Sequence, residues 1–222
     1  MWFPGPARRV PEAGRPSALR LGFDLSPGMR VGLYGGSFNP PHEGHAHVAE
    51  TARARLDLDR VIWLVSPQNP LKRRRAAGLD QRMAQVRRLA RGPSMIVSDI
   101  ESRIGSAYTI DVIRVLKARF PGVKFVWVMG ADNLASFHRW RGWTEIMRLV
   151  PVAVVARPGF VLAGGLAAAA RRFAHARKAP GQAARLAGAR PPAWVYLTAP
   201  LKFVSSTALR RQARAATGQN PP

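Results

Sequence analysis

Two histidines three residues apart, His42 and His45, follow a glycine-rich segment near the start of the chain. Imidazoles at positions i and i+3 share one face of a helical turn, where both can donate hydrogen bonds to the same anion. A helix that begins here would also direct its first N–H groups and the positive end of its dipole toward that anion. These residue types at this spacing predict a phosphate-binding site.

The residues before the histidines fit a strand that ends in a turn. Residues 31–34 are a short apolar run, and Gly35 and Gly36 lack a Cβ atom, so we expect them to break the strand and let the backbone approach a ligand. Two prolines follow, and they suit the start of a helix because a proline N–H is not needed in the first turn. We expect that helix to cover residues 45–56.

Two other interpretations of the histidines are open. Paired histidines on a helix are often only part of the polar surface, and His42, His45 and His47 are close enough in sequence to suggest a metal site. The metalloprotease pattern H-E-x-x-H fails, however, because Ala46 stands where its second histidine would be. The chain contains no cysteine to complete a zinc set and no Gly-Lys-Ser or Gly-Lys-Thr of a Walker A loop. We expect no metal ligands from the protein.

A second candidate anion site lies near the C-terminus. Ser205, Ser206 and Thr207 are residue types that cap helix N-termini, and Arg210 is one turn further along, where its guanidinium can reach back over the same end. Serines before a helix are often simple caps. With the arginine, the segment predicts a second anion cradle.

Both segments resemble signatures of the nucleotidyltransferase superfamily that carries the H-x-G-H motif. Residues 35–45 hold the first, which ends in His42-Glu43-Gly44-His45, and residues 204–210 are similar to the I-S-S-T-x-I-R motif. Within this superfamily, the chain from about residue 30 to about residue 211 looks most like the bacterial nicotinate-nucleotide adenylyltransferases. The resemblance implies adenylyl transfer from ATP to nicotinate mononucleotide, with release of pyrophosphate and formation of deamido-NAD.

Three middle segments carry this narrower resemblance, namely residues 66–72, 107–111 and 130–134. It implies that Tyr108 and Thr109 hold the nicotinate carboxylate and that Trp140 stacks on the pyridine ring, an arrangement that aromatic pairs favour. Ordinary core packing is the alternative for Trp140 and its neighbour Trp143. Lys72 is expected to help neutralise the incoming mononucleotide.

Asp132 completes the expected site. It follows the expected strand 125–129 and is placed like acidic residues that bind ribose hydroxyls, although a helix N-cap is the alternative. The expected catalytic residues are His42, His45 and Arg210. The expected ATP-binding residues are Gly35, Gly36, Ser37, Phe38, His42, His45, Asp132, Ser205, Ser206 and Arg210.

Adenylyl transfer needs little covalent chemistry from a protein. The phosphate oxyanion of the mononucleotide is already a nucleophile, so we expect in-line attack on the α-phosphorus of ATP without a covalent protein intermediate. His42 and His45 would bind phosphate oxygens, while Arg210 and the backbone of the two serines would hold the leaving pyrophosphate. We expect Mg²⁺ to arrive with ATP, because it is commonly bound through substrate phosphates.

The elements that position these residues alternate along the chain. Strands are expected at residues 31–34, 61–65, 95–97, 125–129, 152–156 and 194–197, with helices between them. This alternation predicts an α/β fold of a single domain, a Rossmann-like doubly wound parallel sheet with its ligands beyond the carboxyl ends of the strands. Residues 1–28 are expected to be a disordered extension, 29–216 the domain and 217–222 a mobile tail. Residues 166–178 are expected to be helical and 180–192 a loop.

Composition limits the remaining possibilities. The 222 residues are 47% apolar, enough for one domain with a substantial core. Apolar stretches are strand-sized and residues 1–29 do not resemble a secretory signal, so we expect a cytoplasmic protein without a membrane partner.

A net charge of +23 raises a different class, a basic nucleic-acid-binding protein. Because the arginines are scattered and no nucleic-acid-binding motif stands out, the enzyme is favoured, and a basic field would also attract ATP. Sister adenylyltransferases acting on nicotinamide mononucleotide or phosphopantetheine stay alternatives. The sequence does not indicate an oligomeric state.

Overall fold

Seven parallel strands form the centre of the computed structural model, which describes residues 21–67, 77–156 and 167–198. Every pairing between the described strands is parallel, and the strand order is β3-β2-β1-β4-β5-β7-β6. The strands are β1 (Arg30–Gly36), β2 (Arg60–Val65), β3 (Met95–Ser98), β4 (Lys124–Gly130), β5 (Val152–Val155), β6 (Arg177–Lys178) and β7 (Trp194–Leu197).

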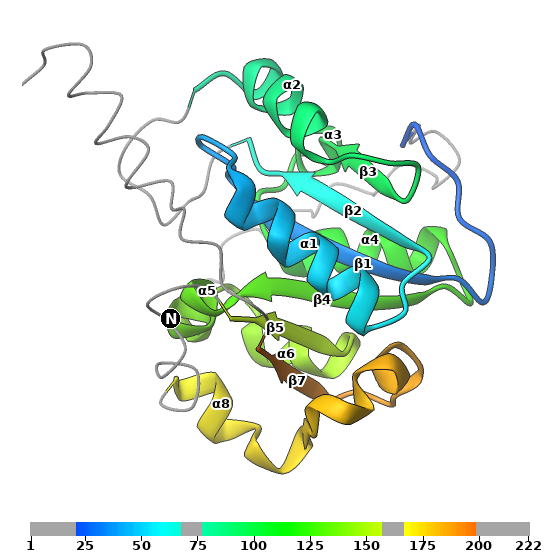
Figure 1. Ribbon diagram of the computed structural model, residues 1–222, viewed down its shortest axis with the longest axis vertical. Helices are drawn as coiled ribbons and strands as arrows, with labels where there is room; N and C mark the ends of the chain where they lie inside the picture. Colours follow the sequence, from blue (N-terminus) through cyan, green and yellow to red (C-terminus); the bar gives the residue numbers. More distant parts are fainter. Residues whose placement is uncertain (1–20, 68–76, 157–166, 199–222) are drawn as a thin grey trace, which may run out of the picture.

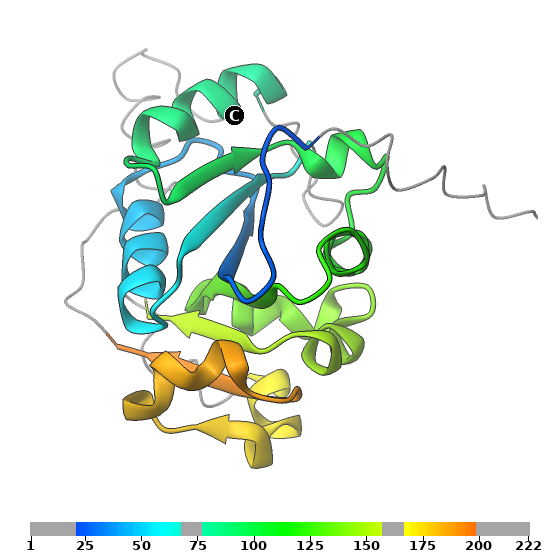
Figure 2. The same ribbon diagram turned by 90° about the vertical axis from the view of Figure 1, so that its right-hand side faces the viewer.

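Helices cover both faces of this sheet (Figures 1 and 2). One layer contains α1 (Glu43–Arg55), α2 (Leu79–Leu89) and the 3₁₀ helix η4 (Pro180–Gly188). The other contains α3 (Ile100–Arg103), α4 (Thr109–Arg119), α5 (Ala131–Ser136), η2 (Phe137–Arg139), α6 (Trp143–Leu149), α8 (Ala168–Arg172) and η3 (Ala174–Ala176). The predicted doubly wound α/β domain is confirmed.

Strand side chains alternate between two hydrophobic cores. In β4, Phe125, Trp127 and Met129 enter the core under α4 and α6, whereas Val126 and Val128 enter the core under α1. Successive side chains of a strand point to opposite faces, so a strand covered on both sides is apolar at every position. This is why the buried strands were visible in the sequence as continuous apolar runs.

The direction of winding changes between β1 and β4, which are neighbours in the sheet. The chain leaves β1 for α1 on one face and leaves β4 for α5 and α6 on the other, as Figure 2 shows edge-on. Ligands of open α/β sheets bind at such a switch point, beyond the carboxyl ends of the strands. In Figure 1 the arrowheads of β2 and β4 point to the side where α1 and α5 begin.

Three expectations about the fold need correction. Strand β1 does not break after Tyr34 but continues through Gly36, because Gly35 and Gly36 keep their parallel register with Leu64 and Val65. Residues 180–192 are not simply a loop, since η4 occupies most of them and buries Ala183, Leu186 and Ala187. Residues 167–178 are helical only in α8 and η3 and end in the short strand β6.

Residues 21–28, assigned from sequence to a disordered extension, pack on the domain instead. Leu21 and Leu25 are buried in the core, and the ring of Phe23 stacks on Phe120 at a centroid distance of 6.0 Å. These side chains belong to the same hydrophobic core as the buried residues of α4. The structured part of the chain therefore begins earlier than the expected boundary at residue 29.

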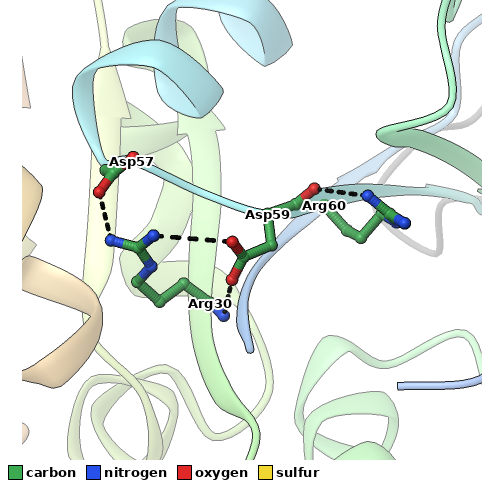
Figure 3. A network of polar contacts seen from close by, with 4 residues as sticks. All are labelled: Arg30, Asp57, Asp59 and Arg60. Atoms are coloured by element: carbon green, nitrogen blue, oxygen red, sulfur yellow. Dashed lines mark hydrogen bonds and ion pairs between the residues drawn. The ribbon is translucent and has the colours of Figure 1, made fainter. Parts of the chain in front are cut away.

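A polar network fixes the amino ends of β1 and β2 (Figure 3). Asp59 accepts the backbone N–H of Arg30 at 2.7 Å, and this hydrogen bond lowers the pKa of the Asp59 carboxyl. The Arg30 guanidinium forms ion pairs with Asp57 and Asp59 on the turn after α1. The network lies at the end of the strands opposite to the predicted site.

Candidate active site

His42 and His45 form the start of α1 and are almost fully buried, with exposed fractions of 5% and 9%. His42 is the N-cap, and its Nδ1 accepts the Gly44 N–H at 3.1 Å. His45 Nδ1 accepts the His42 N–H at the same distance, which completes a reciprocal capping box. The two rings lie 3.8 Å apart between centroids. The motif therefore builds the helix start and brings both imidazoles together.

These hydrogen bonds fix the tautomer of both rings. A ring nitrogen that accepts a backbone N–H carries no proton, so the proton of each neutral imidazole resides on Nε2. Nε2 is then the nitrogen through which each ring can donate to a phosphate oxygen. The backbone of α1 thus holds the two donors in one orientation before any ligand binds.

The sequence predicted that the first N–H groups of this helix would point toward an anion, but three of them have partners within the helix start. The Gly44 N–H is taken by the His42 ring, and the His45 and Ala46 N–H groups are directed at the His42 carbonyl, at 2.7 and 3.4 Å. These three N–H groups are therefore engaged within the helix start itself.

Close packing explains two of the motif residues. A Cβ atom on Gly35 would lie 2.5 Å from Cη2 of Trp127, and one on Gly36 would lie 3.0 Å from Cζ of Phe38. Phe38 is buried at a positive φ of 42°, and its ring packs edge-on against His45 at 5.1 Å. The glycines therefore leave space for aromatic rings, and one of these rings, Phe38, packs against the imidazole of His45.

Asp132 lies at the carboxyl end of β4, in the first turn of α5. The N-cap of α5 is Gly130, so the alternative role of Asp132 as the N-cap is wrong. Since β4 pairs with β1, this carboxylate shares the switch point with Ser37 and the histidines.

Tyr108 is the N-cap of α4 and Thr109 is its first residue, on the opposite layer. The Tyr108 N–H is donated to Ser106 Oγ at 3.2 Å, and Ser106 in turn donates to Asp111 at 2.7 Å. The Tyr108 ring is 37% exposed, and the Arg141 guanidinium lies 4.7 Å from its centroid. A cation therefore stands beside the residue that the sequence analysis assigned to a carboxylate. Sequence reasoning missed Arg141, although it directly follows Trp140.

Trp140 and Trp143 differ in their surroundings. Trp140 is half-buried and packs edge-on against Phe137 and Trp127, at centroid distances of 5.3 and 6.0 Å. Trp143 packs edge-on against Phe173 at 5.8 Å, within the layer formed by α6 and α8. Both indoles are partly buried and both contact Phe137, so it is their other partners that distinguish them, Trp127 for Trp140 and Phe173 for Trp143.

A buried charged pair near the site was not anticipated. Arg82 on α2 and Glu101 on α3 are only 1% and 3% exposed. Burial raises the pKa of the Glu101 carboxyl to about 7, against the opposing effects of a hydrogen bond from Ser66 and the charge of Arg82. The available signal was that Arg82 shares a helix face with the buried Val86, four residues on.

Four of the predicted site residues, Lys72, Ser205, Ser206 and Arg210, lie outside the described residues, as does the tail 217–222. Within the described ranges, no group of three His, Cys, Asp or Glu side chains could hold a metal ion. Over the same ranges, no helix is long and apolar enough to cross a membrane.

A doubly wound parallel sheet with two oriented histidines at its switch point has the form of an H-x-G-H nucleotidyltransferase. In agreement, residues 33–212 match the cytidylyltransferase-like family. A Caulobacter protein named as a probable nicotinate-nucleotide adenylyltransferase is 70% identical over 183 residues, which are 82% of this chain and 97% of that relative. A Cereibacter sphaeroides protein of the same name is 55% identical over 186 residues, covering 84% of this chain and 99% of the relative. The chain belongs to the nicotinate-nucleotide adenylyltransferase family.

The fold is also similar to a solved structure. The nicotinic acid mononucleotide adenylyltransferase of Plasmodium falciparum, complexed with NaAD, superimposes with a TM-score of 0.62 at 15% identity, over 82% of this chain and 83% of that one. At this identity the likeness concerns the fold alone.

Proposed function

We propose that this protein transfers the adenylyl group of ATP to nicotinate mononucleotide, giving deamido-NAD and pyrophosphate. The observation that carries the proposal is the oriented histidine pair at the switch point, in a chain 70% identical to a relative named for this activity. The reaction needs phosphate oxygens held in line and charge stabilised as it develops, which two fixed donors can supply.

In this proposal the 5′-phosphate oxygen of the mononucleotide attacks the α-phosphorus of ATP, and the bond to pyrophosphate breaks. His42 and His45 donate through Nε2 to phosphate oxygens, next to Gly35 and Gly36 at the end of β1 and to Ser37, which follows it. Asp132 binds ribose hydroxyls from the neighbouring strand. Ser205, Ser206 and Arg210 would hold the pyrophosphate, and Lys72 the incoming phosphate, as their sequence motifs predict.

Mg²⁺ carried by ATP would neutralise part of the phosphate charge. We assign the ion to the nucleotide, because Mg²⁺ keeps several waters and is commonly bound through substrate phosphates.

The acid form of the acceptor is supported by charge. The Arg141 guanidinium beside Tyr108 would attract a carboxylate on the pyridine ring and would gain nothing comparable from a neutral amide. Phosphopantetheine carries no pyridine ring for Trp140 to stack on. A cytoplasmic location, and the absence of membrane and nucleic-acid partners, stay predictions of the sequence.

The test is pyrophosphate release by the purified chain with ATP and Mg²⁺ and, in parallel, nicotinate mononucleotide, nicotinamide mononucleotide or phosphopantetheine. We expect a strong preference for the first acceptor. Preference for another acceptor would keep the phosphate chemistry but assign the protein a different substrate. Release with none of them, together with salt-sensitive binding to nucleic acid, would contradict the proposal.

A further inference from the structure

Arg82 is a buried arginine whose hydrogen bonds go to the backbone of the site loops. Its guanidinium donates to at least four carbonyls, those of Ser37, Ser66, Pro67 and Ala77, at distances of 2.6 to 2.8 Å. Burial lowers the pKa of this guanidinium, but an arginine keeps its proton under all physiological conditions. A charge in such a position is stabilised only if its donors are satisfied, and these carbonyls satisfy them.

The carbonyls belong to different segments. Ser37 stands in the loop that leads from β1 to His42, while Ser66 and Pro67 follow the carboxyl end of β2. Ala77 stands just before Gly78, the N-cap of α2, so Arg82 also fixes the start of its own helix. One planar side chain therefore joins the loop after β1, the loop after β2 and the beginning of α2.

Glu101 fixes Ser66, one of the residues that Arg82 binds, through the Ser66 side chain. Its carboxylate accepts a hydrogen bond from Ser66 Oγ, while the Ser66 N–H is donated to the Gly36 carbonyl at 3.1 Å. Helices α2 and α3, which carry Arg82 and Glu101, both contact β2 (Figure 1). Ser66 is thus fixed through its carbonyl, its hydroxyl and its N–H, and it is bonded to the strand end from which the phosphate-site loop departs.

We infer that Arg82 is a positioning residue for adenylyl transfer. It fixes the position of the loop before His42 relative to β2, and so the position of the histidine pair. Arg82 does not touch the nucleotide in this scheme. It acts by holding the Ser37 carbonyl relative to β2, so that the donors on His42 and His45 meet the phosphate in line. A displacement of about 1 Å at a reacting centre can cost on the order of 10²-fold in rate. The kinetic part of this inference rests on the proposed function.

The test compares Arg82→Lys with Val86→Ala. Lysine keeps the charge but cannot reproduce a fork of donors to several carbonyls. Val86 is a fully buried residue of the same helix, and its apolar side chain donates no hydrogen bond to the site loops. Each variant is measured for thermal stability, for kcat and KM with ATP varied, and for amide hydrogen exchange of residues 36–45 and of α4.

We expect Arg82→Lys to lower kcat by about 10- to 100-fold at a temperature where it is folded, and to accelerate exchange in residues 36–45 but not in α4. Val86→Ala should lose stability and keep kcat within about twofold of the wild type. Arg82→Lys with a lower melting temperature but unchanged kcat and exchange would overturn the inference. If Arg82→Lys does not fold, the same measurements are made on Arg82→Gln, whose amide can donate at most two hydrogen bonds to these carbonyls, and unchanged kcat and exchange in that variant would overturn the inference equally.

The exchange measurement separates this inference from the proposed function. If the wild type released no pyrophosphate with any acceptor, the proposed function would be wrong. Faster exchange of residues 36–45 in Arg82→Lys would still support the role of Arg82 in holding the loop, and unchanged exchange would refute that role.

Discussion

Gly35 on β1 and Trp127 on β4 share one space at the switch point. A Cβ atom on Gly35 would come within 2.5 Å of Cη2 and 3.0 Å of Cζ2 of the indole. The space that a side chain at position 35 would occupy is therefore filled by Trp127, the largest side chain of the neighbouring strand. The contact is close to the loop that leads to His42, and Trp140 packs on the same indole at 6.0 Å.

Gly35→Ala is expected to destabilise the protein by about 1–3 kcal/mol, because the buried indole must move to accept the methyl group. Its activity should also fall, since the displaced indole adjoins both predicted substrate positions. Thermal denaturation and kinetics check this, with Gly188→Ala as the control, because a Cβ there meets nothing within 4 Å. Equal stability of the two variants would show that the indole has room to shift.

His45→Asn is expected to separate folding from catalysis. The Asn side-chain oxygen can accept the His42 N–H in place of Nδ1, so the capping box and the melting temperature should be nearly retained. The Nε2 donor is lost, and we expect kcat to fall by about 10²-fold or more. His175→Asn, at an exposed position, is the control. Activity of His45→Asn within a few-fold of the wild type would remove His45 from the mechanism.

Trp140→Ala is expected to weaken the binding of nicotinate mononucleotide more than the binding of ATP. The ring is partly exposed and is held edge-on by Phe137 and Trp127, which suits a surface on which a pyridine can stack. Titrations with each ligand check this. Trp143→Ala should instead reduce stability and leave the ratio of the two affinities unchanged, because that ring packs on Phe173. A larger loss for ATP would mean that the two pockets are reversed.

Arg141→Ala is expected to raise KM for nicotinate mononucleotide by about tenfold, the scale of one charge-assisted hydrogen bond. Any residual turnover of nicotinamide mononucleotide should be unaffected, because its amide carries no charge. Arg139→Ala, an exposed arginine two residues away, serves as the control. An equal loss for both acceptors would assign Arg141 to the common phosphate and not to the carboxylate.

The raised pKa of Glu101 predicts that the free energy of unfolding falls as the pH rises. Burial raises its pKa from 4.5 to about 7, so the folded protein binds the proton more tightly than the unfolded chain. The stabilisation is complete below pH 4.5 and is lost as the pH rises through about 7, by at most about 3 kcal/mol. The stability of Glu101→Gln relative to the wild type should therefore increase between pH 5 and pH 8 in denaturant titrations. A difference that does not change with pH would show that Glu101 is ionised throughout.

The strands could be predicted because their burial is recorded in local runs such as residues 125–129, which are apolar at every position. The histidine pair could be predicted as well, since its spacing determines its position on a helix. The role of Gly35 could not, because the ring that requires it lies on β4, far away in the sequence. The helix η4 was missed because its Ala-rich sequence acquires its buried side only by packing against β7 and β4.

The hydrogen bonds of Arg82 were beyond reach for a similar reason. A single arginine in a chain rich in arginine looks like part of the surface, and only the folded structure brings the carbonyls of Ser37 and Ser66 to its guanidinium. Glu101 was hidden in the same way, since its partner Ser66 stands on another segment. Tertiary contacts of polar side chains leave no periodic pattern that a sequence can display.

Arg82 recognises peptide carbonyls, which every amino acid possesses. The side chains at positions 37, 66, 67 and 77 can therefore be exchanged without removing the acceptors that the guanidinium needs. Substitutions at Ser37 or Pro67 would change the side chains of these loops while Arg82 keeps the same backbone acceptors. The fold thus separates the placement of these two loops from the identity of their side chains.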